Sequence, residues 1–314
     1  VRSAGVWTQQ AKVQQPAGDR QGDGPNDDGE SDEFGYSVAI SSDGLTVVVG
    51  ARHDDYDGPN SGSVYVYDEN AGAWTLNQKL LRFPAANFPV PSAPTLWGDI
   101  ANFGVSVSVN STGTAVAIGA PGIPGAGPDL NLADTGSVFI YAKNGAWVEK
   151  VELAPNVADL VFDMKFGYDV ALSASGTTLI VGAPQGNQNE PNSGQAFVFE
   201  KVAGTWGQQQ RLTPDVNTFA GAQCCERFGL SVATSDDGNT VLVGRDEDDI
   251  SNNLGLAGSA HVFVRRGGQW SNDHLLQQGV GDFGQGDRFG TSVGVSGDGT
   301  GAVVGAPQDD DNSP

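Results

Sequence analysis

Apolar and polar positions along the chain follow one scheme that occurs five times. Each copy opens with Phe-Gly, alternates apolar and small residues, passes a short Ser/Asp/Gly-type turn and enters a nearly unbroken apolar run that closes on Gly. The first copy is "FGYSVAISSDGLTVVVG", from Phe34 to Gly50. The opening Phe and the closing Gly are 16 positions apart in every copy, and the later copies begin at Phe103, Phe166, Phe228 and Phe289. The alternation predicts a strand with one covered face, and the apolar run predicts a strand buried on both faces.

Two further strands are predicted in each unit. In the first unit "SVYVY" at 63–67 has the β-branched and aromatic residues of a third strand, and "WTLNQKL" from Trp74 alternates like an outer strand with one wet face. The other third strands start at Ser137, Gln195 and Ala260, and the other fourth strands at Trp147, Trp206 and Trp270. Because inner strands that are apolar on both faces cannot be covered within one sheet, we expect the sheets to stack radially as a propeller.

The repeated motif resembles a known family. Phe-Gly, a valine-rich strand and then Gly-Ala-Pro, at 119–121, 182–184 and 305–307, is similar to the FG-GAP repeat. That repeat forms the blades of integrin α-subunit head propellers and of many bacterial and algal surface proteins. Arg52 replaces the Pro in the first unit, and Gly244-Arg245 lacks both Ala and Pro. The resemblance covers nearly the whole chain and implies an all-β fold, a β-propeller of four-stranded antiparallel blades.

The two chain ends together predict how the ring closes. We expect one propeller domain over 1–314, with units at 14–81, 82–153, 154–212, 213–276, and 277–314 combined with 1–13. Residues 5–13, "GVWTQQAKV", match a fourth strand with Trp7 aligned to Trp74, so an N-terminal strand is predicted to complete the last blade. A third strand for that blade is missing, apart from Val1. Its residues either lie beyond Pro314 or come from another protomer by strand addition. The alternative architecture is part of a seven-bladed ring, the integrin number.

Charge and hydropathy exclude several classes of partner. The chain has 16 basic and 38 acidic residues, a formal net charge of −22, and this surface repels nucleic-acid phosphates and anionic lipid headgroups. No apolar run approaches the roughly 20 residues that span a bilayer, so we expect no membrane insertion.

Acidic residues that follow the second strands are the candidate metal ligands. Calcium takes six to eight oxygen ligands, of which such loops can supply three or four. The candidates are Asp54, Asp55, Asp57, Asp246, Asp248, Asp309 and Asp311. The alternative is that these carboxylates are solvated or cap turns. The DxDxDG calcium loop of integrin propellers lies between the first and second strands, and the short turns found there, such as "SSDGLT", do not match it.

Other candidate sites stand outside the strand pattern. Trp97 lies in a Pro-rich connection, where it could stack on a sugar, anchor a partner or cover one end of the core. Asn110 begins the sequon Asn-Ser-Thr on a predicted hairpin turn and is a candidate for N-glycosylation. The adjacent Cys224 and Cys225 leave a vicinal disulfide, two free thiols and a link to another chain all open.

These features favour a binding protein over an enzyme. The three histidines lie in different units, and no nucleophile elbow, zinc motif or phosphate-binding loop is present. The leading hypothesis is a non-catalytic extracellular or cell-surface module for adhesion or assembly, one unit of a longer array or filament. Its partner would be a protein or glycan, including neighbouring copies of the chain at the open edge of the last blade. A carbohydrate-binding or carbohydrate-active propeller is the alternative.

Overall fold

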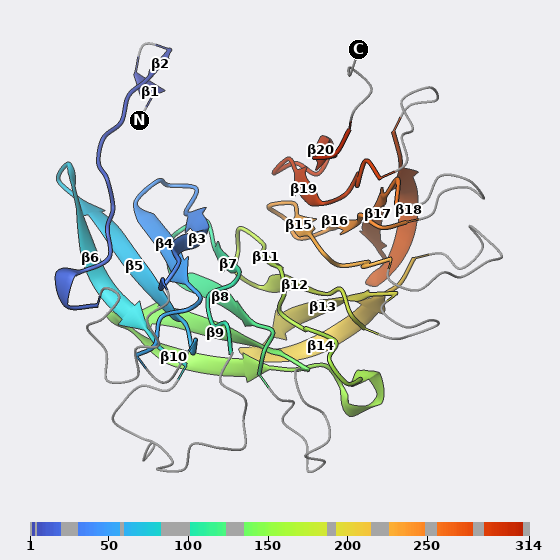
Figure 1. Ribbon diagram of the computed structural model, residues 1–314, viewed down its shortest axis with the longest axis horizontal. Coiled ribbons are helices and arrows are strands. Elements are labelled where there is room, and N and C mark those ends of the chain that lie inside the picture. The colour runs from blue at the N-terminus through green and yellow to red at the C-terminus, as the bar shows by residue number, and fades with distance from the viewer. Residues whose placement is uncertain are drawn as a thin grey trace.

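The computed structural model describes residues 2–3, 5–19, 31–56, 60–82, 101–123, 135–186, 193–214, 226–248, 256–278 and 286–309. In these ranges the chain forms antiparallel sheets that follow one another along an arc (Figure 1). Four of the sheets have four strands each, paired in chain order from the inner to the outer strand. The predicted all-β fold and the propeller arrangement of four-stranded blades are therefore confirmed.

The strand bounds repeat from sheet to sheet. The first sheet contains β3 (Phe34–Ile40), β4 (Thr46–Ala51), β5 (Ser63–Asn70) and β6 (Ala73–Leu80). The second contains β7 (Val107–Val109), β8 (Ala115–Ala120), β9 (Ser137–Asn144) and β10 (Ala146–Leu153). The third contains β11 (Val170–Leu172), β12 (Thr178–Ala183), β13 (Gln195–Val202) and β14 (Thr205–Leu212). The fourth contains β15 (Val232–Thr234), β16 (Thr240–Arg245), β17 (Ser259–Arg266) and β18 (Gln269–Leu276).

The remaining elements are short. The last sheet consists of β19 (Ser292–Val295) and β20 (Ala302–Gly305), and a separate N-terminal pair consists of β1 (Arg2–Ser3) and β2 (Val6–Trp7). Two 3-10 turns, η1 (Ala17–Asp19) and η2 (Val157–Asp159), are the helical elements of the described residues.

The hydrophobic core lies between neighbouring sheets. Between the second and third sheets, Ile140 and Leu153 pack against Phe166, Phe197 and other apolar residues of the third sheet. The Phe of each Phe-Gly lies edge-on against the first aromatic residue of its own third strand, and the Phe166 and Phe197 ring centroids are 5.5 Å apart. In the fourth sheet that aromatic position holds His261, whose burial lowers its pKa to about 3. Each Phe therefore packs between adjacent blades, as the repeat predicts.

The two glycines of each unit allow neighbouring sheets to touch through their backbones. A Cβ atom placed on Gly119, at the end of β8, would lie 2.0 Å from the carbonyl oxygen of Gly167, the Gly of the next Phe-Gly. Gly182 meets Gly229, and Gly244 meets Gly290, in the same way at 2.0 Å. The Phe-Gly glycines also have positive φ angles, which favour glycine. The fixed interval between Phe and Gly therefore positions one backbone contact per junction.

A serine after each Phe-Gly-x reinforces this contact in three junctions, and Asp169 replaces it in the fourth. Ser106 Oγ donates a hydrogen bond to the Gly167 carbonyl oxygen across the junction, at 3.1 Å. The carboxylate of Asp169 instead accepts from the backbone N–H of Val232, at 2.8 Å, and of Val170, at 2.9 Å. Desolvation by the surrounding protein outweighs these two hydrogen bonds and raises the Asp169 pKa to about 6.

Closure of the ring by the N-terminal strand, which the sequence predicts, does not occur in this structure. β1 and β2 pair only with each other, and β19 and β20 form a two-stranded sheet. Contacts between sheets run in chain order from the first to the last, and no comparable contact joins the described strands of the first sheet to β19 or β20. The N-terminal segment instead lies on the first sheet, where Tyr67 Oη donates to the carbonyl oxygen of Gln14 at 2.8 Å.

Substitution of Gly119 by Ala tests the backbone contact. Because the new Cβ would overlap a carbonyl oxygen that cannot rotate away, we expect Gly119→Ala to lower the free energy of unfolding by about 3 kcal/mol or more. Gly207→Ala in β14 is the control, since a Cβ there meets nothing within 4 Å, and it should cost less than about 1 kcal/mol. Urea unfolding followed by tryptophan fluorescence measures both. Equal losses would contradict the proposed role of the contact.

Substitution of Asp169 by Ser tests the buried charge. A carboxyl group whose pKa is raised on folding binds its proton more tightly in the folded state, so stability is highest below the unfolded pKa near 4 and is lost as the pH rises to 6. We therefore expect Asp169→Ser to be more favourable at pH 8 than at pH 4, by about 2 kcal/mol. Unfolding curves at the two pH values measure this difference. Ser231→Ala should show no such dependence, and a pH-independent effect of Asp169→Ser would contradict the assignment.

Candidate functional site

The acidic turn after β4 is bound into the first sheet by protein donors. Asp54 is buried, and its Oδ2 accepts hydrogen bonds from Ser63 Oγ at 2.7 Å and Tyr65 Oη at 2.8 Å. Lys79 Nζ from β6 lies 3.0 Å from the same oxygen. Burial and the Asp54 charge raise the pKa of Tyr65, so its hydroxyl remains a donor. Asp54 therefore acts as a clasp between the turn and the third and fourth strands of its sheet.

Two further buried carboxylates belong to the same region. Asp55 Oδ1 accepts the backbone N–H of Asn60 at 2.6 Å, which closes the turn. Asp32 Oδ2 accepts from Gln15 Nε2 at 2.7 Å. Burial raises the pKa of Asp32, and the charges of Asp54 and Asp55 add to that effect. The carboxylates are thus close enough to interact electrostatically while each has a protein donor.

Arginines neutralise the acidic turn after β16. Arg227 pairs with Asp246 through both guanidinium and carboxylate groups, at 3.1 Å and 2.5 Å. Arg245, which replaces the Ala of the repeat, pairs with Asp248 at 3.0 Å and with Glu226. Such bidentate and buried pairs fix geometry between the two charges. These carboxylates have protein cations in the place that a metal ion would take.

The calcium hypothesis is neither supported nor tested further by this geometry. Among the described residues no group of three or more His, Cys, Asp or Glu side chains is arranged to hold a metal ion. Asp309 is exposed in the turn after β20, whereas Asp57 and Asp311 lie outside the described residues. Calcium binding at these loops therefore stays a prediction.

Asn110 occupies the hairpin turn between β7 and β8, as predicted, but its side chain is buried. Its Oδ1 accepts the backbone N–H of Thr114 at 2.8 Å and of Ala115 at 2.9 Å. Its Nδ2, the atom to which a glycan would be attached, donates to Thr112 Oγ1 at 3.2 Å. The folded turn therefore does not present this amide for glycosylation. Trp97, Cys224 and Cys225 lie outside the described residues, so the hypotheses attached to them stay open.

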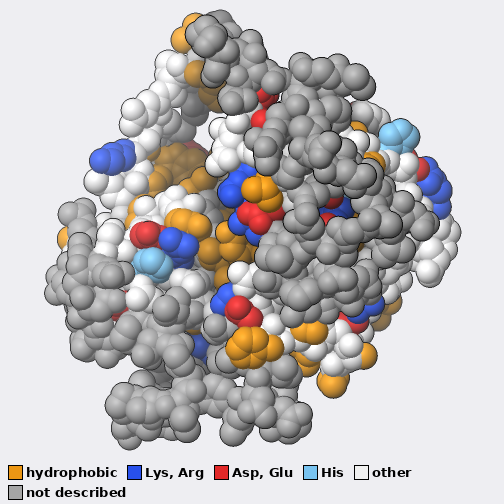
Figure 2. Space-filling model, turned by 45° about the vertical axis from the view of Figure 1, so that its right-hand side comes forward, with side chains coloured by type: hydrophobic (Ala, Val, Ile, Leu, Met, Phe, Trp, Pro, Cys, Tyr) orange, Lys and Arg blue, Asp and Glu red, His pale blue; other side chains and the backbone are white. Residues whose placement is uncertain are grey.

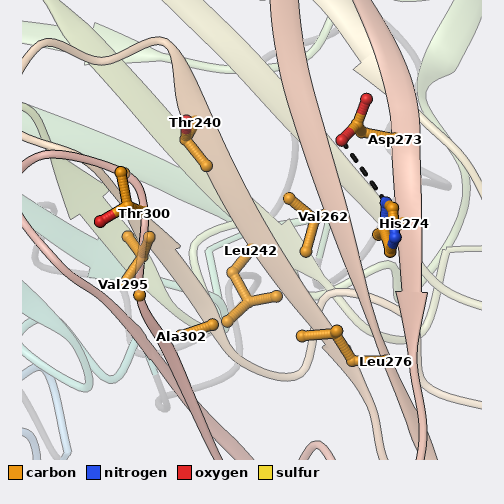
Figure 3. A pocket seen from close by; sticks show the side chains of 11 residues that line it. Thr240, Leu242, Val262, Asp273, His274, Leu276, Val295, Thr300 and Ala302 are labelled. Carbon is orange, nitrogen blue, oxygen red and sulfur yellow. Dashed lines mark ion pairs between the residues drawn. The ribbon is translucent and has the colours of Figure 1, made fainter.

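An apolar cavity lies where the last blade is open. It has a volume of about 480 Å³ and is bounded by the fourth sheet on one side and by β19 and β20 on the other (Figure 3). Leu242, Val262 and Leu276 line it from the fourth sheet. Val295 and Ala302 line it from the last sheet. We call the surface formed by these five residues the open seat.

The corresponding surface of the third sheet shows what such a seat holds. Ile180, Val198 and Leu212 occupy there the strand positions that Leu242, Val262 and Leu276 occupy in the fourth sheet. They pack in one buried cluster with Phe263 of β17 and Trp270 of β18. The open seat therefore has the shape and chemistry of a site for one aromatic residue of a third strand and the Trp of a fourth strand.

A glutamine clamp marks the outer rim of two closed junctions. Gln210 Nε2 donates to the Trp270 carbonyl oxygen at 3.0 Å, and its Oε1 accepts the Trp270 N–H at 3.1 Å. Gln78 holds Trp147 in the same way. At the rim of the open seat this position is His274, an exposed side chain 3.5 Å from Asp273 (Figure 3). The rim thus presents a polar side chain where a clamp to the next outer strand would form.

The repeat pattern predicts an open edge on the last blade but does not identify the seat. Its residues become recognisable only when the second, third and fourth strands of successive units are aligned, since Leu242, Val262 and Leu276 then match three buried residues. In the space-filling view, hydrophobic side chains are visible inside a hollow in the upper half of the molecule, the half in which Figure 1 places both chain ends (Figure 2).

The comparison with protein families agrees with the repeat geometry. A family model described as FG-GAP repeat matches residues 24–67, 147–199 and 281–314. The chain carries FG-GAP repeats. The matched ranges include the Phe-Gly segments of the first, third and last units, so the FG-GAP positions are those that form the junction contacts described above. No curated protein matches the chain significantly.

Solved structures with FG-GAP-like topology are distant. A periplasmic gluconolactonase from Pseudomonas aeruginosa is 14% identical with a TM-score of 0.48 over 85% of this chain, and hydrazine synthase from Kuenenia stuttgartiensis is 11% identical with a TM-score of 0.48 over 86%. The chain spans 64% and 61% of these two chains, less than two thirds of either. No helix among the described residues has the length and apolar character needed to cross a membrane.

Substitution of Asp54 by Asn tests the clasp. The change removes the charge that pairs with Lys79 and places an amide opposite two hydroxyl donors, so we expect a loss of about 2 kcal/mol in the free energy of unfolding. Asp309→Asn, an exposed position, is the control and should change the free energy by less than about 0.5 kcal/mol. Denaturation is measured in buffer with EDTA. A loss that appears only when calcium is added would indicate a metal ligand and contradict the clasp.

Proposed function

We propose that this chain is a non-catalytic assembly module of an extracellular or cell-surface protein, which binds protein partners at the open seat of its last blade. The observation that carries the proposal is the cavity of about 480 Å³ beside Leu242, Val262 and Leu276. The matching face of the third sheet is covered by Phe263 and Trp270 of the fourth. An uncovered apolar surface of this kind is typical of a protein interaction site.

The edge of β20 supports binding by strand addition. In each four-stranded sheet the second strand pairs with a first strand on one side and a third strand on the other, whereas β20 pairs only with β19. Its other edge offers backbone N–H and C=O groups to an incoming strand, and the seat beside it selects aromatic side chains. A partner hairpin with the FG-GAP third and fourth strand pattern matches both features.

The location and the absence of catalysis rest on composition and on the roles of the charged groups. FG-GAP repeats are typical of extracellular proteins, and the net charge of −22 keeps such a surface soluble. The groups with strongly shifted pKa values, Asp169, Tyr65 and His261, each stand at a repeat position where other units place Ser or an aromatic residue. Their shifts are explained by packing between blades and call for no reaction chemistry.

A peptide with the outer hairpin of the third sheet tests the proposed function. Residues 195–212, "QAFVFEKVAGTWGQQQRL", contain both of its outer strands, and we expect the peptide to bind the chain with one-to-one stoichiometry in calorimetry. Since the Trp would fill the cavity, Trp206→Ala in the peptide should weaken binding at least tenfold.

The chain offers a matched variant for the same titration. Ala302→Arg places a large side chain in the seat from an exposed position, so it should abolish peptide binding without unfolding the protein. Binding that is indifferent both to Trp206→Ala and to Ala302→Arg would exclude the seat as the docking site.

A further inference from the structure

Residues 2–13 have the structure of an outer blade hairpin, and we call them the N-terminal hairpin. In β1 and β2, Arg2 pairs with Trp7 and Ser3 with Val6. In the first sheet Glu69 pairs with Trp74 and Asn70 with Ala73, the same register counted from the Trp. Gly5 also has a φ of 81°, close to the 90° of Gly72 in the corresponding turn. The hairpin therefore contains the end of a third strand and a fourth strand.

The end of the N-terminal hairpin lies on the first sheet as a preceding blade would. Val13 follows Trp7 by six positions, the interval between Trp74 and Leu80. It packs in the cluster that contains Tyr65 and Tyr67, as Leu80 packs in the cluster between the first and second sheets. Tyr67 Oη donates to the Gln14 carbonyl oxygen at 2.8 Å, and Tyr141 Oη to that of Leu81 at 2.6 Å. The hairpin thus occupies the outer position of a blade before the first sheet.

The inner strands of that preceding blade are missing from the described structure. The side of β3 that would face them is exposed at Val38 (68%) and Ile40 (59%), whereas Val107, the counterpart of Val38 in the second sheet, is 9% exposed. Trp7 itself is 76% exposed, although the fourth-strand Trp residues of the second to fourth sheets are buried. The N-terminal hairpin is therefore half of a blade without its other half.

The last sheet is the complementary half. β19 and β20 are a first and a second strand without a third or a fourth, and Val303 of β20 is 70% exposed. The two halves stay apart within one chain, since β1 and β2 pair only with each other. One end of the arc thus presents an outer hairpin with an exposed Trp, and the other end presents a seat shaped for that Trp.

We propose that the N-terminal hairpin of a second copy of this chain completes the last blade of the first copy. The proposal rests on the proposed function, because it names the partner of the open seat. The composite blade consists of β19 and β20 from one copy and residues 2–13 from the next, with Trp7 in the cavity and its backbone beside His274. The same contact covers Val38 and Ile40 of the second copy.

The symmetry of this contact predicts a linear assembly. The hairpin and the seat are different surfaces at opposite ends of the arc, so each bound copy still presents one free hairpin or one free seat. Such a heterologous contact continues from copy to copy instead of stopping at a dimer. The chain is therefore expected to form head-to-tail oligomers whose size increases with concentration.

Sedimentation velocity over a hundredfold range of concentration tests the assembly. We expect the wild-type chain to form oligomers with increasing concentration and Trp7→Ala to remain monomeric, with an association constant reduced at least tenfold. Phe162→Ala is the matched control, because it removes another exposed aromatic side chain, outside the hairpin and the seat, and should assemble like the wild type. Oligomers that persist in Trp7→Ala would overturn the proposal.

A mixture of two variants distinguishes assembly from ring closure within one chain. Trp7→Ala keeps an intact seat, and Ala302→Arg keeps an intact hairpin, so each alone should be monomeric and the mixture should form dimers that grow no further. If the mixture stays monomeric, or if wild-type Trp7 is protected from acrylamide quenching in a monomer, the hairpin closes its own ring and the proposal fails. Binding of the 195–212 peptide would still support the seat in that case, so the two failures are distinguishable.

Discussion

The fold depends on a backbone contact between neighbouring sheets that tolerates no side chain. The Gly that ends one second strand touches the carbonyl oxygen of the Gly in the next Phe-Gly, at Gly119 and Gly167 for example. Because this contact brings the inner strands together, the Phe next to it can fill the space farther out, against the aromatic residues of the third strand. The wedge shape of a propeller follows, with small residues near the axis and large residues outside.

Closely packed junctions also explain where polar groups are tolerated. Ser106 bridges its junction with one neutral hydrogen bond, whereas Asp169 brings a charge that can only accept, and its pKa rises to about 6 because water is excluded. The acidic turns after β4 and β16 lie at the edge of the sheets, where Lys79 and Arg227 reach them. Position relative to the junction thus decides whether a carboxylate is a burden or a clasp.

Much of the fold follows from the sequence because the repeat states the same physical requirement five times. The Phe-to-Gly interval, the buried second strands and the outer Trp of each unit predict the sheets and the order of their strands. The state of the ends could not be predicted in this way. Trp7 aligns with Trp74 whichever inner strands it joins, and only coordinates show that it joins none of those described. The clasp at Asp54 was equally hidden, because a carboxylate that accepts from Ser63 and Tyr65 has the same sequence pattern as a calcium ligand.

The open ends acquire meaning from the closed junctions between them. In each closed junction a face such as Ile180, Val198 and Leu212 is covered by the aromatic residues of the following sheet, so an uncovered copy of that face defines its missing partner by chemistry and register. Leu242, Val262 and Leu276 form that copy, and Trp7 with Val13 has the spacing of the partner. Since the arc holds these surfaces apart, the interaction that joins blades within the chain is also the interaction most suited to join one chain to the next.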